Sequence, residues 1–236
     1  MEQKPAQPQH EPSTTRRQAR SGHTFPGERV PVLQQMLDQL SAQPYLWSLL
    51  RRIVEHGFRG EQQVIARELA PWRDPGRRMF LDFGCGTGEF AACFPAGHYV
   101  GIDLSPAYLR FAQRSQSRQF VAASGAALAL ADQRFDAALV LGVLHHLADP
   151  VARAALIELH RVLRPGATLL VLEDIPPPDR WNIAGRAMHW LDRGGNIRDD
   201  AAYRLLFHPE FTVIRTYTMR SGICDYGVYV LRRNDQ

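Results

Sequence analysis

The sequence has little cysteine and no long apolar run. Its 236 residues include 3 cysteines, Cys85, Cys93 and Cys224. These are too few and too unevenly spaced for a disulfide framework or a zinc site, so we expect free thiols in a reducing compartment. No apolar stretch approaches the roughly 18 residues of a membrane span, and the opening residues lack the apolar segment of a signal peptide. Together these absences predict a cytoplasmic protein without a membrane span.

A strong excess of one charge sign is also lacking. The chain carries 28 Lys and Arg residues against 24 Asp and Glu residues, a formal net charge of +4. The basic residues are scattered rather than gathered in blocks, which disfavours a nucleic-acid partner. RNA association stays open as a variant because the balance is basic. Nothing in this composition indicates an oligomeric state.

Composition divides the chain into three regions. Residues 1–27 are rich in Pro, Gln, Ser, Thr and Arg and have almost no large apolar side chain before Phe25, which predicts a disordered tail. Residues 28–75 place apolar residues three and four apart, which predicts an N-terminal cap of two or three amphipathic helices. The turn signal DPGRR, residues 74–78, leads into the third region, residues 76–236.

The third region alternates short apolar runs with helical stretches. We expect strands at residues 79–83, 98–103, 119–123, 135–141 and 167–173, and crossover helices at 88–94, 106–116, 126–131 and 149–166. Such runs without polar alternation indicate a parallel sheet covered on both faces. Two further runs, 210–220 and 224–233, are joined by so few residues that they must form an antiparallel hairpin. The expected fold is α/β: a three-layer, doubly wound, mostly parallel seven-stranded sheet with a terminal antiparallel hairpin and an N-terminal helical cap.

The stretch LDFGCGTGEF, residues 81–90, places glycines directly behind the first predicted strand. Gly84, Gly86 and Gly88 permit a tight turn and remove the Cβ atoms that would hold a ligand away from the backbone. In a doubly wound sheet the ligand lies at the carboxyl ends of the strands. We therefore expect a ligand on this loop, although the glycines could serve the turn alone. The GCGTG spacing is also one residue shorter than the dinucleotide-binding GxGxxG pattern.

An acid ends the second predicted strand, about twenty residues beyond the loop. Asp103 stands where a carboxylate binds ribose hydroxyls in nucleotide-binding βαβ units. Helix capping is the alternative role, but Ser105 is already placed as N-cap with Pro106 after it. We therefore predict that Asp103 binds a ribose.

Four motifs resemble, in order and spacing, those of the class I S-adenosylmethionine-dependent methyltransferases: LDFGCGTGEF, GIDLSPAYL, RFDAALVLGVLHHLADP and HRVLRPGATLLVLED. The resemblance runs from about Arg77 to the end and includes the terminal hairpin. It implies S-adenosylmethionine as cofactor, S-adenosylhomocysteine as product and methyl transfer as the reaction. It also implies that the loop glycines pack against the methionine part and the sugar, that Asp103 takes the ribose hydroxyls and that Leu104 lies near adenine.

The resemblance extends the cofactor site to two further loops. The backbone from Leu141 to Val143 is expected to line the methionine part of the cofactor. Many relatives carry an Asp near the adenine amino group after the third strand, whereas this chain has Ser124, whose neutral hydroxyl is a weaker acceptor. Besides the glycines and Asp103, the expected cofactor-binding residues are Asp82, Cys85, Leu104, Ser124, Gly125, Leu141 and Gly142.

The candidate catalytic residues are His146, His145 and Glu173. The histidines follow the fourth predicted strand, and the resemblance favours His146 as the one that faces the substrate, while His145 could equally shape the loop. A histidine pair can indicate a metal, but adjacent side chains point in different directions and no third ligand is close in sequence, so we expect no metal. Of Glu173 and Asp174, we expect one to face the substrate and the other to cap or pair with an arginine.

The acceptor is expected to be a small molecule. Transfer from a sulfonium needs in-line positioning and water exclusion, and a base only if the acceptor starts protonated. The fourth strand is followed by LGVLHHL and not by an NPPY-like or DPPY-like motif of enzymes that methylate nucleic-acid amines. We therefore expect an enzyme acting on a small molecule. A non-catalytic binding scaffold, an RNA-directed methyltransferase and a nicotinamide-dependent oxidoreductase are the alternatives, of which the glycine spacing and the hairpin disfavour the last.

Two segments are expected to build the acceptor pocket. One is the cap, with aromatic residues at Tyr45, Trp47 and Phe58 that could equally be docking core. The other is an insertion at residues 176–200, a predicted lid with apolar residues and a possible glycine hinge. Its apolar candidates are Trp181, Ile183, Met188, Trp190 and Leu191, and its basic candidates are Arg186, His189 and Arg193. This composition favours an apolar or aromatic acceptor.

Overall fold

The protein is described here from a computed structural model that covers residues 43–69, 78–176, 178–183, 185–187 and 195–235. The predicted tail, residues 28–42 and 70–75 of the predicted cap, and residues 188–194 of the predicted lid lie outside the described residues. No helix within the described ranges is long and apolar enough to cross a membrane.

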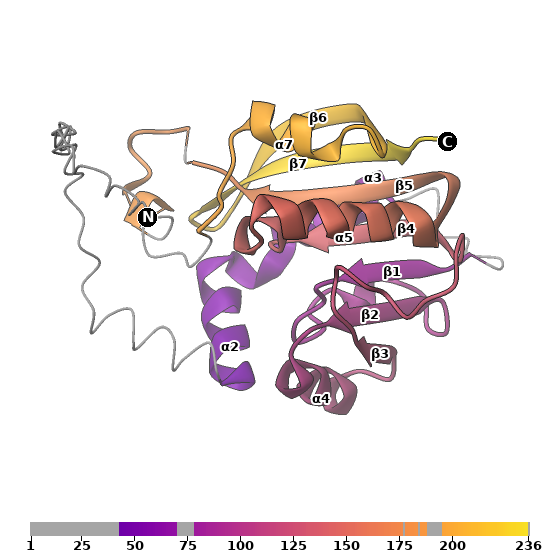
Figure 1. Ribbon diagram of the computed structural model, residues 1–236. Coiled ribbons are helices and arrows are strands. Elements are labelled where there is room, and N and C mark those ends of the chain that lie inside the picture. Colours follow the sequence, from indigo (N-terminus) through magenta and orange to yellow (C-terminus); the bar gives the residue numbers. More distant parts are fainter. Residues whose placement is uncertain (1–42, 70–77, 177, 184, 188–194, 236) are drawn as a thin grey trace, which may run out of the picture.

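One seven-stranded sheet organises the chain, in the order β3-β2-β1-β4-β5-β7-β6 (Figure 1). Strands β1 to β5 pair with one another in parallel, and β7 is antiparallel to both β5 and β6. The predicted fold class and the terminal hairpin are confirmed. The strand bounds are Phe80–Phe83 (β1), Tyr99–Asp103 (β2), Gln119–Ala122 (β3), Phe135–Leu141 (β4), Leu163–Asp174 (β5), Phe211–Ser221 (β6) and Cys224–Arg233 (β7).

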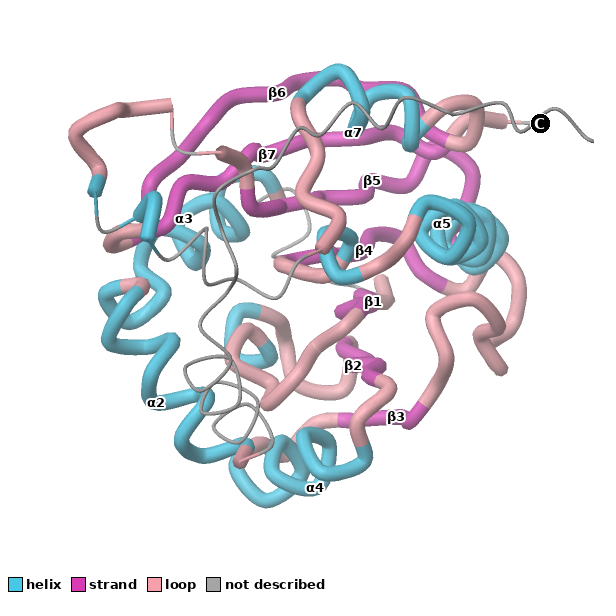
Figure 2. The backbone as a smooth tube through the Cα atoms, turned by 60° about the vertical axis from the view of Figure 1, so that its left-hand side comes forward, coloured by secondary structure: helices cyan, strands magenta, loops and turns pink. Residues whose placement is uncertain are grey.

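Helices cover both faces of the sheet (Figure 2). Helices α5 and α7 pack on one face and α3 and α4 on the other, so alternate residues of β5, such as Leu169 and Leu170, enter two different cores. Burial on both faces is why the central strands lack a polar period. The helices are α2 (Pro44–Val54), α3 (Arg59–Glu68), α4 (Pro106–Ser115), α5 (Asp149–Val162) and α7 (Asp200–Phe207), with 3₁₀ turns η1 (His56–Phe58), η3 (Ala91–Cys93) and η4 (Leu144–His146).

Two crossover helices predicted from the sequence are absent, so those predictions are wrong. Residues 88–94 form turns and the short η3, because too few residues separate the glycine loop from Pro95. Residues 126–131 are mostly irregular, and their main chain is bonded by α5 side chains: Glu158 accepts from Leu128 N, and Arg161 donates to the carbonyls of Leu128 and Leu130. Side chains of α5 thus take the place of helical hydrogen bonds.

Helix α5 is shorter than predicted, and β5 begins earlier. The helix ends at Val162, because Pro165 disfavours a helical conformation at the residue before it, and Leu163 is already extended. The start of β5 then pairs Leu163 with Phe135 of β4. Helix α4 begins as predicted, with Ser105 Oγ accepting from Tyr108 N and a proline in the first turn.

Candidate active site

The three glycines that follow β1 all have positive φ, but their surroundings differ. A Cβ atom at Gly84 would lie 2.4 Å from Val143 Cγ2, and one at Gly88 would lie 3.1 Å from Ala112 Cβ. Nothing lies within 4 Å of a Cβ atom built at Gly86. Gly84 and Gly88 therefore allow internal close packing, whereas only Gly86 of the three faces open space in which a ligand could approach the backbone.

Asp103 holds this loop in place from the end of β2. Its Oδ2 accepts from Gly86 N at 2.9 Å, and its Oδ1 accepts from Ser105 N at 2.7 Å. A carboxylate has about four lone-pair sites, so each oxygen keeps an acceptor position beyond these bonds. Leu104, the next residue, is exposed. A fixed carboxylate, an open glycine and an exposed apolar side chain at one strand edge are suited to a nucleoside.

Asp82 and Cys85 point away from that edge. Asp82 is buried and accepts from Tyr99 Oη at 2.7 Å. Burial raises the pKa of Asp82 to about 7, against the hydrogen bond from Tyr99, and the negative charge of Asp103 adds to the rise. Burial also raises the pKa of the Cys85 thiol, which packs beside Gly101. Neither of these two predicted side chains faces the open edge at Gly86, and the main chain of Cys85 is bonded to Ile102 and Gly88.

The remaining predicted cofactor residues surround the same edge. Ser124 is exposed and forms a bridge with Ala127. A Cβ atom at Gly125 would lie 2.4 Å from Phe83 Cζ, so packing alone demands that glycine. Leu141 is buried at the end of β4, and Gly142 follows it with φ of 65°.

Glu173 organises the histidine loop from the end of β5. It is fully buried, and its Oε1 accepts from Val143 N at 3.0 Å and from Leu144 N at 2.7 Å. Its Oε2 accepts from His145 N at 3.2 Å and lies 2.6 Å from His145 Nδ1. All four bonds go to the loop that contains η4, so this carboxylate acts on the loop and is not exposed to a substrate.

The two histidines differ in exposure. His145 is buried, and its Nε2 lies 3.7 Å from Asp174 Oδ2, so the imidazole stands between two carboxylates. A proton on Nδ1, directed at Glu173, leaves Nε2 as the acceptor in the neutral ring. The His146 ring packs against it at a centroid distance of 4.0 Å and is exposed. Within the described part of the chain, no three His, Cys, Asp or Glu side chains cluster as a metal site would require.

Arg198 fixes the other side of the histidine loop, and the sequence did not point to it. Its NH1 donates to Leu144 O at 2.7 Å, and its NH2 donates to Leu147 O at 2.7 Å. Its Nε and NH2 also bond Asp149 Oδ1, and Asn196 N donates to His145 O at 3.0 Å. The loop is therefore held through its N–H groups by a buried anion and through its carbonyls by a buried cation. Arg198 lies in the sequence NIRDD, which matches no known motif, so its role in holding the histidine loop could be recognised only from the fold.

A polar network docks the cap beside these groups. Arg51 Nε donates to Glu55 Oε1 at 2.8 Å, and Tyr226 Oη donates to Glu55 Oε2 at 2.9 Å. Burial opposes ionisation of Glu55, but Arg51 and the hydrogen bonds outweigh it, so its pKa is lowered. Ser221 Oγ donates to Glu61 Oε2 at 2.7 Å, and burial together with the neighbouring Glu55 raises the pKa of Glu61 to about 8. Since Tyr226 pairs with Asp174 across β7 and β5, the cap is anchored next to the histidine loop.

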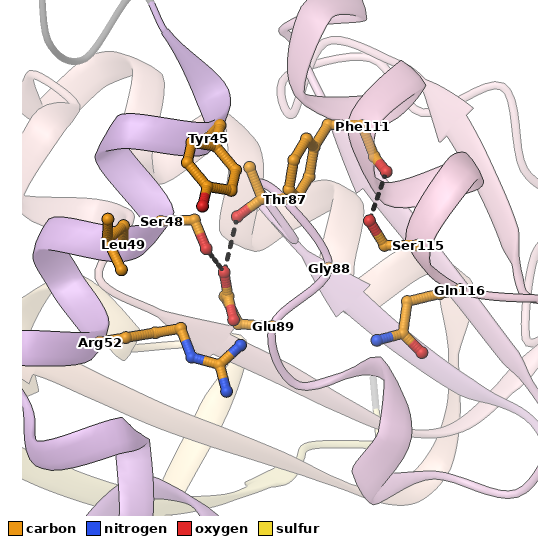
Figure 3. Close-up of a pocket in the computed structure, with 10 residues that line it drawn as sticks. All are labelled: Tyr45, Ser48, Leu49, Arg52, Thr87, Gly88, Glu89, Phe111, Ser115 and Gln116. Carbon is orange, nitrogen blue, oxygen red and sulfur yellow. Dashed lines mark hydrogen bonds between the residues drawn. The ribbon is translucent and has the colours of Figure 1, made fainter.

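A pocket of about 300 Å³ lies where α2 meets the glycine loop and α4 (Figure 3). Across it, Ser48 Oγ donates to Glu89 Oε1, and the same oxygen accepts from Thr87 Oγ1 at 3.2 Å. The cap is thus tied directly to the predicted cofactor loop. The lining residues are Tyr45, Ser48, Leu49, Arg52, Thr87, Gly88, Glu89, Phe111, Ser115 and Gln116.

The predicted pocket aromatics fall into different environments. Phe58 is buried in the core, as expected for docking, whereas Tyr45 is exposed at the pocket. Trp181 and Ile183 are exposed. The side chain of Trp47 and residues Met188, His189, Trp190, Leu191 and Arg193 lie outside what the structure describes.

Comparison with known proteins identifies the family of this chain. A profile of the methyltransferase domain family matches residues 81–171. A ubiquinone/menaquinone biosynthesis C-methyltransferase, UbiE, of Syntrophotalea carbinolica is 38% identical over 176 residues, which are 68% of this chain and 71% of that protein. A demethylmenaquinone methyltransferase of Thermus thermophilus is 35% identical over 56% of this chain and 62% of that protein. A tRNA (carboxymethyluridine(34)-5-O)-methyltransferase of Arabidopsis thaliana is 31% identical over 59% of this chain but only 38% of its own length.

Solved structures share the fold at lower identity. A chain from the complex between the Haloferax volcanii Trm112 methyltransferase activator and a methyltransferase superposes with a TM-score of 0.62 at 16% identity, over 86% of this chain and 98% of that one. The [4+2]-cyclase SpnF superposes with a TM-score of 0.58 at 19% identity, over 75% and 80% of the two chains. Taken with the sequence relatives, this chain belongs to the class I S-adenosylmethionine-dependent methyltransferases. Its cofactor is S-adenosylmethionine, and the open backbone at Gly86 and the fixed Asp103 suit that nucleoside.

Proposed function

We propose that the protein transfers the methyl group of S-adenosylmethionine to a small apolar or aromatic acceptor that carries an acidic O–H or C–H. The observation that supports this most is the histidine loop, which Glu173 and Arg198 fix beside the half-buried Asp174. Two relatives whose names specify quinone methylation support an acceptor of this class. The acceptor loses a proton and gains the methyl group, while the cofactor leaves as S-adenosylhomocysteine.

The cofactor-binding roles are assigned within this proposal. Asp103 binds the ribose hydroxyls with the lone pairs left after its bonds to Gly86 and Ser105. Gly86 lets the cofactor approach the main chain, and Leu104 offers an apolar surface to adenine. Ser124, Gly125, Leu141 and Gly142 complete the walls, and Asp82 and Cys85 support the loop from beneath with buried side chains.

The acceptor-facing roles follow exposure. His146 is exposed and Asp174 is half-buried, so we assign these two groups to receive the proton and orient the acceptor. Glu173 and His145 are buried beneath them and act as positioning residues. The sequence resemblance favoured His146 in the same way, but it left Glu173 and Asp174 undistinguished. The three-region division of the chain and a cytoplasmic location remain part of this proposal.

The first experiment is a thermal unfolding series with S-adenosylmethionine, S-adenosylhomocysteine and, as a control, NADH. A ligand at about 100 times its dissociation constant adds roughly 2.7 kcal/mol to stability. We expect both sulfur nucleosides to raise Tm and NADH to leave it unchanged. Methyl transfer to hydroquinones and phenols should then be measured with radiolabelled cofactor for the native chain and for His146→Gln. Cofactor binding without transfer to any such acceptor would contradict the proposed acceptor class.

RNA is the second candidate acceptor, because one relative is named as a tRNA methyltransferase. The same radiolabel assay with total tRNA tests it. Salt-sensitive retention on RNA together with label in the RNA fraction would favour this alternative over a small molecule.

A further inference from the structure

Two segments at the cap expose large apolar side chains. Helix α2 presents Leu46, Leu49 and Ile53, which are three, four and seven residues apart and so share one helix face. Ile53 is 67% exposed. The segment after β5 presents Trp181 and Ile183, which are 75% and 73% exposed. We call these five residues the apolar rim.

The two halves of the apolar rim meet at the β6–β7 turn. Ile223 N donates to Val54 O at 3.3 Å, next to Ile53. Asn182, which lies between Trp181 and Ile183, donates from Nδ2 to Ile223 O at 3.0 Å. In both Figure 1 and Figure 2, α2 and the segment after β5 lie at the same end of the sheet. The rim is therefore one region of the surface, joined through a single turn.

Arginines are interleaved with the apolar rim. Arg52 precedes Ile53 and is exposed, and the Arg180 guanidinium lies 4.9 Å from the centre of the Trp181 ring. Arg186, whose main-chain N–H donates to Asn182 O at 2.9 Å, is also exposed. The nearby Asp179 and Asp225 both face Arg220. Exposed arginines therefore border the apolar side chains of the rim.

We propose that the apolar rim docks the protein on an anionic lipid bilayer. Trp together with Leu and Ile, bordered by arginines, is the composition that lies at the boundary between headgroups and acyl chains. Large exposed apolar side chains gathered in one region of a surface mark an interaction site. The rim adjoins Tyr226, which pairs with Asp174, so a docked protein has the acceptor site open beside the membrane. Docking does not depend on the proposed reaction, although a lipid-soluble acceptor would arrive by this route.

Vesicle sedimentation of the full chain tests the proposal. Vesicles of phosphatidylcholine with an equal part of phosphatidylglycerol are compared with pure phosphatidylcholine at low and high salt. We expect partition into the anionic vesicles to be at least tenfold stronger and to weaken with salt. The rim variants are Ile53→Gln with Trp181→Gln, and Arg180→Gln with Arg186→Gln. Each pair should reduce partition at least tenfold, while the Tm shift with S-adenosylmethionine stays as in the native chain.

The matched control is Ile157→Gln with Leu205→Gln. Both residues are exposed, and they lie on α5 and α7, on the opposite face of the sheet. The control should bind vesicles like the native chain. No binding to anionic vesicles, equal binding to both vesicle types, or an equal loss in the control would overturn the proposal. A native mass of two chains in light scattering that falls to one in the Ile53 and Trp181 variant, without vesicle binding, would assign the rim to a second copy instead.

Discussion

Asp103 and Glu173 are both acids at the carboxyl ends of parallel strands, and both hold a loop by accepting main-chain N–H groups. Asp103 accepts two such bonds and stays half-buried at an open glycine. Glu173 accepts three, together with a histidine ring, and is fully buried. Acidic residues at equivalent strand ends are thus accessible in one case and buried in the other. What separates them is whether the fold leaves lone pairs facing solvent.

The neighbours of the two acids follow the same logic. Beside Asp103, the exposed Leu104 continues the open edge. Beside Glu173, the pleat turns Asp174 to the opposite face, toward the cap and Tyr226. In the proposed function, the site has a cofactor half around the accessible carboxylate of Asp103 and an acceptor half around Glu173 and Asp174. In the acceptor half, Glu173 holds the histidine loop and Asp174 is assigned to the acceptor.

Glu173→Gln should have the largest effect. A glutamine replaces one acceptor oxygen with a donor that faces N–H groups of the histidine loop, and buried groups would lose charged hydrogen bonds of about 1.5–3 kcal/mol each. We expect the free energy of unfolding to fall by about 3 kcal/mol and methyl transfer to be lost, as measured by urea denaturation and radiolabel assay. The control is Asp174→Asn at the next position, which should lower activity with little loss of stability. Equal stability losses in both variants would contradict the assignment of a structural role to Glu173 and an acceptor-facing role to Asp174.

Asp103→Asn should come next, with its effect on ligand binding instead of folding. The amide keeps one acceptor, and water can reach the half-buried site, so we expect a stability loss of only about 1 kcal/mol. The affinity for S-adenosylhomocysteine should fall about 10- to 100-fold in calorimetry, because a charged acceptor for the ribose hydroxyls is lost. The exposed Arg204→Gln on α7 serves as a surface control. Unchanged affinity in Asp103→Asn would remove the ribose assignment.

The local geometry of the proposed cofactor half was predictable from sequence because its signals are local. Three glycines behind a strand, and an acid at the end of the next strand, define their own geometry within one βαβ unit. The terminal hairpin was predictable for the same reason, since a short link leaves no other pairing. The strand bounds of β4 and β7 match the predicted ranges.

The acceptor half was less predictable because long-range contacts define it. Which of Glu173 and Asp174 is buried depends on the pairing of β5 with β7 and on the loop after β4. Arg198 acts on a loop about 50 residues earlier in the chain, and no spacing within its own segment indicates this. The helix predicted at residues 126–131 does not form for a similar reason, because side chains of α5 bond the main chain of this segment. An amphipathic pattern in the sequence does not reveal hydrogen bonds from side chains that are distant along the chain.

Arg198→Lys should have a smaller effect than either carboxylate change. Lysine keeps the charge but loses the planar fork that bonds two carbonyls and Asp149. We expect kcat to fall about tenfold with KM for the cofactor unchanged, because the histidine loop loosens while the glycine loop does not. The exposed Arg204→Lys on α7 is the matched control. Millimolar guanidinium should partly restore kcat in Arg198→Ala if the fork positions the loop. A change in cofactor KM equal to the change in kcat would instead make Arg198 a general structural residue.

The smallest effect should be a pH dependence that links Asp103 to the buried Asp82. Native Asp82 keeps its proton up to a pKa of about 7, whereas the unfolded residue loses it near pH 4. The native state therefore binds more protons between these values, and this group's contribution to stability falls as pH rises through that window. Asp82→Asn should reduce the loss of unfolding free energy between pH 5 and pH 8 by about 1 kcal/mol or more, as measured by urea denaturation. The remaining slope should include Glu61, whose pKa is also raised, to about 8. Because the charge of Asp103 adds to the raised pKa of Asp82, Asp103→Asn should flatten the slope in the same direction but by less. An unchanged slope in both variants would mean that the accessible carboxylate and the buried one beneath it are not electrostatically coupled.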